Sequence, residues 1–110
     1  MNSIISARHM NVPKSFKQYA HKKLNKLPRY YDDTQEIELV IEQNNGNSIE
    51  LEIVARAKHN HTFIATEKNE DIYACFNRAV HRLKRQLRKQ KEKERCQKAE
   101  RLHKSNNNKP

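Results

Sequence analysis

The sequence predicts an α+β two-layer sandwich, in which a four-stranded sheet carries two helices on one face. Apolar residues alternate at period two in segments 36–43 and 49–57, the pattern of half-buried strands. They recur at spacings of three and four after residues 13 and 69, the pattern of amphipathic helices. Because 110 residues with 35% hydrophobic content can build one core, both helices should cover one sheet face and leave the other to water.

The first third of the chain predicts a strand and a helix. Residues 3–8 (SIISAR) form a β-branched run that ends in a polar turn before Pro13. Pro13 suits the first turn of a helix. One apolar stripe follows it, formed by Phe16, Ala20, Leu24 and Leu27. Pro28 should end this helix a few residues early, because its ring fixes φ and removes a backbone donor.

The middle of the chain predicts a hairpin and one further strand. In 36–43 (EIELVIEQ) and 48–57 (SIELEIVARA), apolar side chains alternate mainly with glutamates. The turn at 44–47 combines asparagines with Gly46, the only glycine of the chain, and both residue types tolerate positive φ. After a polar break, 62–66 (TFIAT) predicts a shorter fourth strand. The expected order of elements is therefore β-α-β-β-β-α.

The longest predicted element is the last helix. Its apolar stripe consists of Ile72, Phe76, Val80, Leu83 and Leu87. Asn69 is the expected N-cap, with Glu70 and Asp71 in the first turn.

The end of the chain has few apolar residues that could pack against the core. Beyond Leu87 the apolar stripe stops, although residues of good helix propensity continue to about Leu102. We therefore expect a folded α+β domain over residues 1–95, followed over 96–110 by a basic, polar and disordered tail.

The charge of the chain predicts a polyanionic partner. The net charge is +10 and the isoelectric point is near 9.8. Residues 1–35 carry a net +5, residues 36–69 a net −3 and residues 70–110 a net +8. The helices therefore hold the positive charge and the exposed sheet face is acidic. Because that face would repel phosphates, bases should not stack on it as they do in RNA recognition motifs.

The sharpest local feature is segment 78–91 (RAVHRLKRQLRKQK), which holds seven basic residues and no acid. Within it, one basic stripe steps by four, three and four: Arg78, Arg82, Arg85 and Lys89. Neighbouring like charges cost helix stability, and RNA phosphates would offset that cost through counterion release. Lysines of the first helix should extend the same surface: Lys14, Lys17, Lys22, Lys23 and Lys26. Ordinary solvated helix faces are the alternative, but they usually mix lysine with glutamate, and here mixing begins only after Lys91.

Other locations and partners fit the sequence less well. A basic amphipathic helix can lie on a membrane or in a calmodulin-like groove, but here the apolar stripe is needed to cover the sheet. No segment approaches the roughly 20 apolar residues of a membrane span, and the N-terminus lacks the apolar core of a signal peptide. Cys75 and Cys96 are far apart and fit a reducing compartment. We expect a cytoplasmic protein without a membrane partner.

Catalysis has one weak candidate, the pair His59 and His61 beside Lys58, which could act as an acid and a base on RNA. Two histidines on a loop are more often polar filler, and no third metal ligand has useful spacing. With a single glycine and no phosphate-loop or hydrolase motif, nucleotide chemistry is disfavoured. We expect no enzyme activity, no catalytic residue, no metal, no cofactor and no small-molecule substrate.

Two segments resemble the ribosome hibernation-promoting factor and ribosome-associated translation inhibitor family, in its short type. They are 5–33 (ISARHMNVPKSFKQYAHKKLNKLPRYYDD) and 70–93 (EDIYACFNRAVHRLKRQLRKQKEK), and the likeness covers residues 2 to about 95. The distinctive parts are the KLxKL-type run at 23–27 with the tyrosines after it, and the Asp-x-Tyr-Ala and RQLRKxK motifs of the last helix. The family fold is β-α-β-β-β-α and similar to double-stranded RNA-binding domains, in agreement with the order predicted above.

The resemblance implies a ribosome hibernation factor. Members of this family bind small-subunit rRNA at the positions that mRNA and tRNAs would occupy. By occupying these positions they inhibit translation in resting or stressed cells, without catalysis. The RNA-binding residues implied by the motifs are Lys22, Lys23, Lys26, Arg82, Arg85, Arg88, Lys89 and Lys91, to which the basic stripe adds Arg78. The expected partners are the ribosome and its small-subunit rRNA, with the protein monomeric off the ribosome. An influence on ribosome dimerisation is possible in either direction and stays open.

The chain also departs from the family pattern. Ala7 replaces a usual Gly, Pro13 a frequent Thr cap, and Asn77 and His81 replace acids, which raises the basic character of the last helix. Three interpretations remain open: a ribosome-silencing binder, a general structured-RNA-binding module, and a small RNA-processing enzyme that uses the two loop histidines.

Overall fold

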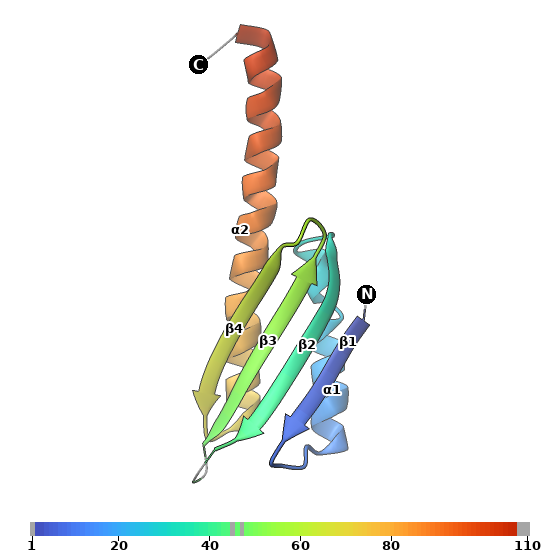
Figure 1. The fold of residues 1–110 in the computed structure, drawn as a ribbon, viewed down its shortest axis with the longest axis vertical. Coiled ribbons are helices and arrows are strands. Elements are labelled where there is room, and N and C mark those ends of the chain that lie inside the picture. Colours follow the sequence, from blue (N-terminus) through green and yellow to red (C-terminus); the bar gives the residue numbers. More distant parts are fainter. Residues whose placement is uncertain (1, 45, 47, 108–110) are drawn as a thin grey trace.

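The computed structural model describes the backbone of residues 2–44, 46 and 48–107, and the side chains of those up to Cys96. The elements in chain order are β1 (Asn2–Arg8), α1 (Lys14–Leu24), the 3-10 helix η1 (Leu27–Arg29), β2 (Thr34–Gln43), β3 (Ile49–Ala57), β4 (Thr62–Asn69) and α2 (Ile72–Asn107). Figure 1 shows the four strands in front and both long helices behind them. The predicted α+β sandwich with helices on one sheet face is confirmed.

The sheet is mixed, with strand order β1-β2-β3-β4. β1 runs parallel to β2, because the chain crosses behind the sheet through α1 before it returns as β2. β2, β3 and β4 pair antiparallel as consecutive hairpins. α1 packs on β1, whereas α2 packs on β3 and β4, so the two helices lie side by side on the same face.

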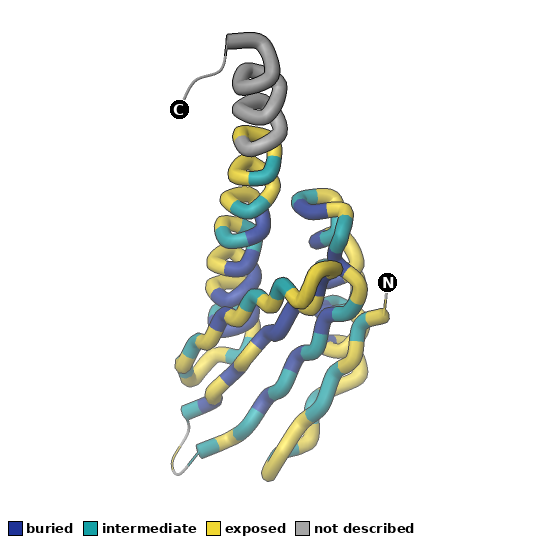
Figure 2. Tube along the Cα trace, turned by 45° about the horizontal axis from the view of Figure 1, so that its top comes forward, coloured by how far each residue is buried: buried dark blue, intermediate teal, exposed yellow. Residues whose placement is uncertain are grey.

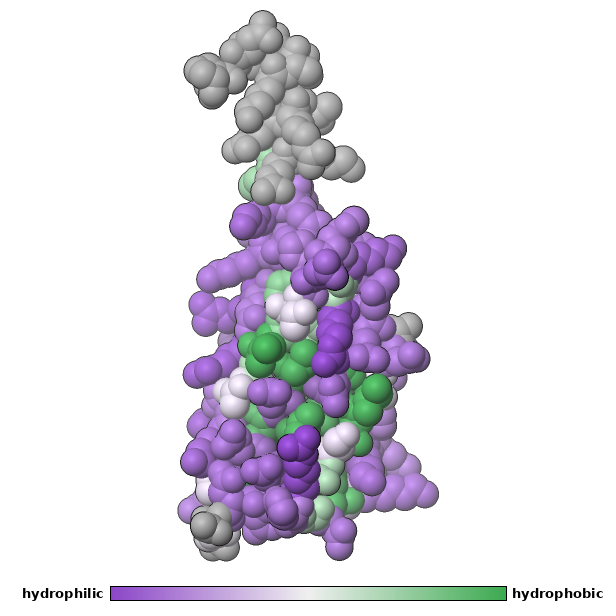
Figure 3. Space-filling model, in the orientation of Figure 1, coloured by the Kyte–Doolittle hydropathy of each residue, from purple (hydrophilic) through white to green (hydrophobic). Residues whose placement is uncertain are grey.

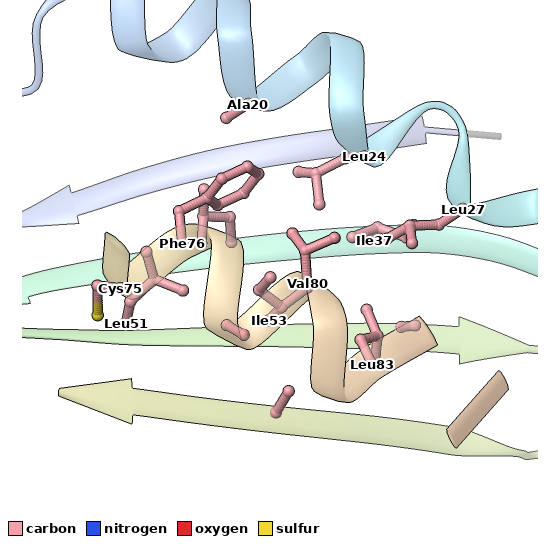
Figure 4. Packing of buried hydrophobic residues seen from close by; sticks show 14 of the residues in the cluster. Ala20, Leu24, Leu27, Ile37, Leu51, Ile53, Cys75, Phe76, Val80 and Leu83 are labelled. Atoms are coloured by element: carbon pink, nitrogen blue, oxygen red, sulfur yellow. The ribbon is translucent and has the colours of Figure 1, made fainter. Parts of the chain in front are cut away.

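One core fills the space between the sheet and the helices. Buried positions alternate along β2 and β3, as the period-two pattern predicts, and Figure 2 shows this alternation as dark and lighter segments. In Figure 4, Phe76, Val80 and Leu83 of α2 face Ile53 of β3 and Leu24 of α1. The apolar stripes of both helices and the alternating apolar residues of β2 and β3 therefore meet in a single cluster.

The end of α1 follows from Pro28. α1 ends at Leu24, and the chain turns through η1, which has Pro28 near its start. A 3-10 turn accommodates proline because the missing N–H would belong to an unsatisfied first turn in any case. Leu27 remains fully buried on this turn. The predicted early termination of the first helix is confirmed, and the stripe continues into the core across the break.

The start of α2 differs from the prediction. The backbone N–H of Tyr73 donates to Asp71 Oδ1 at 2.9 Å, so Asp71 is the N-cap. Asn69 instead accepts a hydrogen bond from the backbone N–H of Asp71 at 3.0 Å and is the last residue of β4. The prediction of Asn69 as N-cap, with Glu70 and Asp71 inside the first turn, is therefore wrong. The reason is that β4 keeps its pairing with β3 as far as Asn69, beyond the predicted end at Thr66.

α2 is 36 residues long, which corresponds to about 54 Å. Among the side chains described, up to Cys96, its last buried residue is Leu87, as the apolar stripe predicts, and the helix then projects beyond the sheet (Figure 1). The helical backbone continues to Asn107, through most of the segment for which the sequence predicts a disordered tail. Residues 108–110 lie outside the described part of the chain, and the division at residue 95 stays a prediction.

Candidate nucleic-acid interface

α2 carries basic side chains on both flanks of its apolar stripe. On the flank next to β4, a row of exposed side chains follows the helix, here called the β4-side row: Arg78, Arg82, Arg85 and Lys89. Arg82 and Arg85 line two shallow surface hollows, one shared with Arg78 and the other with Lys89. The predicted basic stripe is therefore a continuous surface.

Two contacts fix the β4-side row against the sheet. Arg82 Nε lies 2.8 Å from Glu67 Oε2 of β4, although the Arg82 side chain remains 62% exposed. One turn further on, Gln86 Nε2 donates to the carbonyl oxygen of Ile64 at 2.8 Å. Arg82 is thus partly neutralised by its own protein. Arg78, Arg85 and Lys89 form no ion pair with any described residue and are the freer cations of the row.

The opposite flank faces the segment that follows α1. Here a second set of basic side chains steps by four, three and four along α2, called the η1-side row: Lys84, Arg88, Lys91 and Arg95. Arg88 Cζ lies 4.8 Å and Lys84 Nζ 5.3 Å from the centre of the Tyr30 ring. Because Tyr30 follows η1 whereas Glu67 belongs to β4, the two rows lie on different sides of the helix.

The η1-side row borders a hollow of about 320 Å³. It is lined by Arg29, Tyr30, Arg88, Lys91, Glu92 and Arg95. Arg88 and Lys91 belong to the RNA-binding set predicted from the sequence, whereas Arg29, Lys84 and Arg95 do not. The four-three-four spacing of these basic residues on a helix predicts the row. No local pattern in the sequence indicates that Tyr30 lies beside it.

α1 joins this surface through Asn77 of α2. Tyr19 and Lys23 both donate to Asn77 Oδ1, at 2.9 and 3.3 Å, and Lys23 Nζ lies 5.1 Å from the centre of the Tyr19 ring. The hydrogen bond with Lys23 is the main cause that lowers the pKa of the Tyr19 hydroxyl. Asn77, where the family pattern has an acid, therefore connects the two helices as a neutral acceptor.

The nine predicted RNA-binding residues all lie on the helical side of the molecule. Lys22 and Lys26 are exposed on and just after α1, and Lys23 is half-buried beside Asn77. The six from α2 are exposed: Arg78, Arg82, Arg85, Arg88, Lys89 and Lys91. The structure divides these six between the two flanks of α2: Arg88 and Lys91 lie in the η1-side row, and the other four form the β4-side row.

A tyrosine from the α1–β2 connection holds α2 beyond the core. Tyr31 is 3% exposed and its hydroxyl donates to Glu94 Oε2 at 2.5 Å, while Gln90 Nε2 donates to the same oxygen at 2.8 Å. The Tyr31 hydrogen bond is the largest cause that lowers the pKa of the Glu94 carboxyl. Burial, followed by the carboxylate of Glu94, raises the pKa of the Tyr31 hydroxyl. These contacts set the orientation of the segment that carries Lys91 and Arg95.

The open face of the sheet carries more acidic than basic side chains, the basic ones being Arg8, Arg56 and Lys68. It carries five glutamates: Glu36, Glu38, Glu42, Glu50 and Glu52. Arg56 lies 2.7 Å from Glu36 and 3.3 Å from Glu38, whereas Glu42 and Glu50 are direct cross-strand neighbours. Figure 3 shows a small apolar area over the middle of this face, with hydrophilic atoms around it. This face is therefore a poor surface for phosphate.

The loop histidines His59 and His61 lie in or next to the β3–β4 turn. His59 and Asn60 have positive φ values of 62° and 61° in the β3–β4 turn. The His61 ring stacks on Phe63 with centroids 6.3 Å apart, and Phe63 in turn meets Tyr31 edge to face at 5.9 Å.

Among the described residues, no group of three or more His, Cys, Asp or Glu side chains is placed to hold a metal ion. Nor is any helix in the described part of the chain long and apolar enough to cross a membrane.

Comparison with known families decides the relationship. Residues 3–95 match the family described as Sigma 54 modulation protein / S30EA ribosomal protein. The chain belongs to this family. The match spans β1 to the exposed part of α2, so it includes the whole core and both basic rows. The resemblance predicted from the sequence is thereby confirmed.

Characterised relatives in this family carry names that refer to ribosome hibernation. The chain is 28% identical over 94 residues to the ribosome hibernation promotion factor of Bacillus subtilis, covering 84% of this chain and 50% of that protein. It is 29% identical over 91 residues to the factor of Staphylococcus aureus, covering 79% and 46%. It thus spans about half the length of these two relatives. For the Pseudomonas putida factor the identity is 26% over 98 residues, with 82% and 86% covered.

Solved structures of the family share the fold. The N-terminal domain of Thermus thermophilus Protein Y superimposes with a TM-score of 0.72 at 28% identity, covering 81% of this chain and 98% of that one. A ribosomal subunit interface protein from Coxiella burnetii gives a TM-score of 0.75, covering 84% and 99%, and at 18% identity shows the fold alone.

Proposed function

We propose that this family member is a ribosome hibernation factor, which binds the small ribosomal subunit in the cytoplasm and holds it inactive in resting or stressed cells. The observation that carries the proposal is the separation of charge between the two layers. Nine predicted RNA-binding cations lie on the helical side, and five glutamates lie on the open sheet face. The names of the relatives support the ribosome as the partner.

The proposed mechanism is steric occlusion by a bound protein without catalysis. The basic rows of α2, together with Lys22, Lys23 and Lys26, bind rRNA phosphates in the path of mRNA and tRNAs. Several such contacts give tight, salt-sensitive binding, which is reversible when growth resumes. The acidic sheet face repels phosphate and so fixes which layer faces the RNA. Off the ribosome the chain is monomeric in this proposal.

A general structured-RNA-binding module is the second candidate. It is favoured by the same basic rows, because phosphate contacts carry no sequence information by themselves. The two candidates differ in the preferred ligand. A hibernation factor binds small subunits much more tightly than a free RNA duplex, whereas a general module binds both alike.

Co-sedimentation through sucrose gradients tests the proposal. The full chain is mixed with purified small subunits, or with free duplex RNA, at low and at moderate salt. The variant Arg85→Gln/Lys89→Gln removes two free cations and spares Arg82, whose partner Glu67 would otherwise lose its counter-charge. The control Arg8→Gln/Lys68→Gln removes the same charge from exposed positions at the rim of the open sheet face.

The expected results separate the candidates. The unaltered chain and the control should stay bound to small subunits at moderate salt, while the Arg85/Lys89 variant should bind at least roughly tenfold more weakly. Equal affinity for duplex RNA would favour the general module. Equal loss in both variants would show that overall charge, and not the helical face, drives binding.

A further inference from the structure

We propose that the open face of the sheet is a docking surface for a basic, amphipathic segment of another protein. The inference goes beyond the proposed function, because it concerns the layer opposite the basic helices and does not depend on RNA binding. The surface combines an apolar strip across all four strands with carboxylates on the two central strands. The apolar residues are here called the open-face strip: Ile4, Val40, Val54 and Ile64.

Strand alternation places the strip on the open face. Residues next to it in the chain belong to the core cluster or pack against it: Ile5, Leu39, Ile53 and Ala65. Because successive side chains of a strand point to opposite faces, the strip residues point away from the core. Val54 shows this most clearly, since it is only 8% exposed and yet is not a member of the core cluster. Its neighbours on the open face therefore cover it.

The register of the strands makes the strip continuous. Val54 of β3 is the direct cross-strand partner of Ile64 in β4. Val40 of β2 is the diagonal neighbour of Val54 on one side and of Ile4 on the other. Direct and diagonal neighbours on one face are close enough for long side chains to interact. With neighbouring strands about 4.7–4.9 Å apart, the strip runs roughly 14 Å across the sheet.

The two ends of the strip are open to solvent. Ile4 is 43% and Ile64 51% exposed, and they are two of the three large apolar side chains that are exposed in the described part of the chain. In Figure 3 the apolar area over the middle of this face is surrounded by hydrophilic atoms. A contiguous apolar patch with a polar rim is typical of a protein interaction site, whereas an RNA backbone gains little from burying it.

The carboxylates beside the strip determine the charge of the partner. Three glutamates of this face form no ion pair with any described residue: Glu42, Glu50 and Glu52. Glu42 and Glu50 are direct cross-strand neighbours and repel each other. Arg8 and Lys68 flank this pair on the outer strands without forming an ion pair with it. Lysine or arginine side chains of a partner would relieve the repulsion, whereas an acidic partner would increase it.

The length of the strip favours a short helix as the docked segment. At 1.5 Å per residue, about nine or ten helical residues span roughly 14 Å. Apolar side chains at positions i, i+3 or i+4, and i+7 would then lie along the strip, and flanking lysines or arginines would reach the glutamates. A second copy of this chain is less suitable, because the apolar stripes of both α1 and α2 are already buried in its own core.

Titration with a synthetic peptide tests the proposal. The probe is an amphipathic peptide of about 14 residues with one leucine stripe flanked by lysines, and a scrambled peptide of the same composition is its control. Each is added to the full chain labelled with ¹⁵N, at moderate salt, which screens repulsion by the net charge of +10. The amide signals of Val40, Val54 and Ile64 should shift and saturate with the first peptide, while those of α2 should not.

Two paired substitutions separate the apolar and the charged contribution. Ile4→Thr/Ile64→Thr shortens the exposed ends of the strip but keeps β-branched residues in the strands, and it should weaken peptide binding roughly tenfold. Glu50→Gln/Glu52→Gln removes two exposed carboxylates without an ion partner among the described residues. It should weaken binding roughly threefold to fivefold, and by less as the salt concentration rises.

The matched control is Glu70→Gln/Glu92→Gln, which removes the same charge from exposed positions outside the open face. It should bind the peptide as the unaltered chain does. Equal binding of the scrambled peptide, or equal loss in this control and in the Glu50/Glu52 variant, would show that charge alone attracts the peptide, and the proposal would be wrong. Unchanged open-face signals at about 1 mM peptide would also refute it.

Two further titrations identify a different occupant of the open face. If the same amide signals shift when the unlabelled chain is added, and sedimentation equilibrium shows a dimer that Ile4→Thr/Ile64→Thr abolishes, a second copy occupies the face and the proposal is overturned. If they shift with duplex RNA, the proposal is overturned and RNA also contacts the sheet layer. Since no ribosome is present in the peptide titrations, their failure leaves the proposed function standing.

Discussion

Removing the Tyr31 hydroxyl should loosen the exposed part of α2 while leaving the core in place. Glu94 lies two turns beyond the buried Leu87, and the hydrogen bond from Tyr31 is its contact with the α1–β2 connection. The change Tyr31→Phe deletes one oxygen atom. The ring keeps its edge-to-face contact with Phe63 at 5.9 Å. The substitution therefore tests the hydrogen bond alone.

The size of the effect follows from the partners. A hydrogen bond to a charged group contributes about 1.5–3 kcal/mol, and solvent at the half-buried Glu94 reduces this to about 1–1.5 kcal/mol. Since 1.36 kcal/mol is a factor of ten, local opening of segment 88–95 should become roughly tenfold more frequent. Global unfolding should change less, because segment 88–95 contributes no residue to the core cluster.

Amide hydrogen exchange followed by mass spectrometry measures this opening. Peptides from segment 88–95 should exchange faster in Tyr31→Phe, while those from β3 should not change. Tyr30→Phe is a matched control, because it deletes a hydroxyl from the neighbouring tyrosine. If Tyr31→Phe and the unaltered protein exchange alike at pH 7, the hydrogen bond does not hold the helix and the reasoning is refuted.

The same contact predicts a pH window. The bond lowers the pKa of Glu94, so its contribution to stability is complete above the ordinary carboxyl pKa near 4.3 and is lost as the pH falls through the lowered value. The pKa of Tyr31 is raised, so the alkaline limit lies above the ordinary tyrosine pKa near 10. Exchange rates of the two proteins should therefore differ at pH 7 and converge below about pH 4.

Other substitutions test the core, the thiols and the surface. Leu83→Ala should cost about 2–5 kcal/mol in urea unfolding, because Leu83 is fully buried between α2 and the sheet; a loss below about 1 kcal/mol would contradict this packing. A thiol reagent at pH 8 should label the exposed Cys96 quickly. It should label Cys75 only after the structure around this residue opens, because burial raises the pKa of the Cys75 thiol to about 11. In Cys96→Ser the fast phase of labelling should vanish. Arg56→Gln should cost less than about 1 kcal/mol and nothing in 1 M salt, since its ion pairs with Glu36 and Glu38 are exposed; a salt-independent loss would indicate a packing role.

The fold could be predicted from the sequence wherever local pattern and tertiary packing agree. The alternation of apolar and polar residues on both sides of the Gly46 turn predicts the β2–β3 hairpin. The apolar stripe from Ile72 to Leu87 predicts the packed part of α2. The cap of α2 could not be predicted, because Asn69 and Asp71 are equally good capping residues. The choice depends on how far β4 stays paired with β3, which is a long-range property.

The site was predictable in composition but not in arrangement. Charge counts identify the basic residues of α2, and helical spacing groups them into rows. What each row faces depends on residues far away in the sequence. Tyr30 and Arg88 are 58 positions apart, as are Tyr19 and Asn77, and no local signal relates either pair. For this reason the contact of the η1-side row with Tyr30, and the hollow beside it, emerged only from the structure.

The division of charge between the layers has a kinetic consequence. Glutamates on the open face and cations on the helices give the chain an electric dipole across its thin dimension. In the field of a polyanion this dipole experiences a torque, which turns the helical layer toward the polyanion before contact. Random docking of two specific patches limits association to about 10⁵–10⁷ M⁻¹s⁻¹, and alignment during approach raises that limit at low salt. If the proposed function holds, the glutamates of the face turned away from the RNA would thus affect how fast the chain arrives.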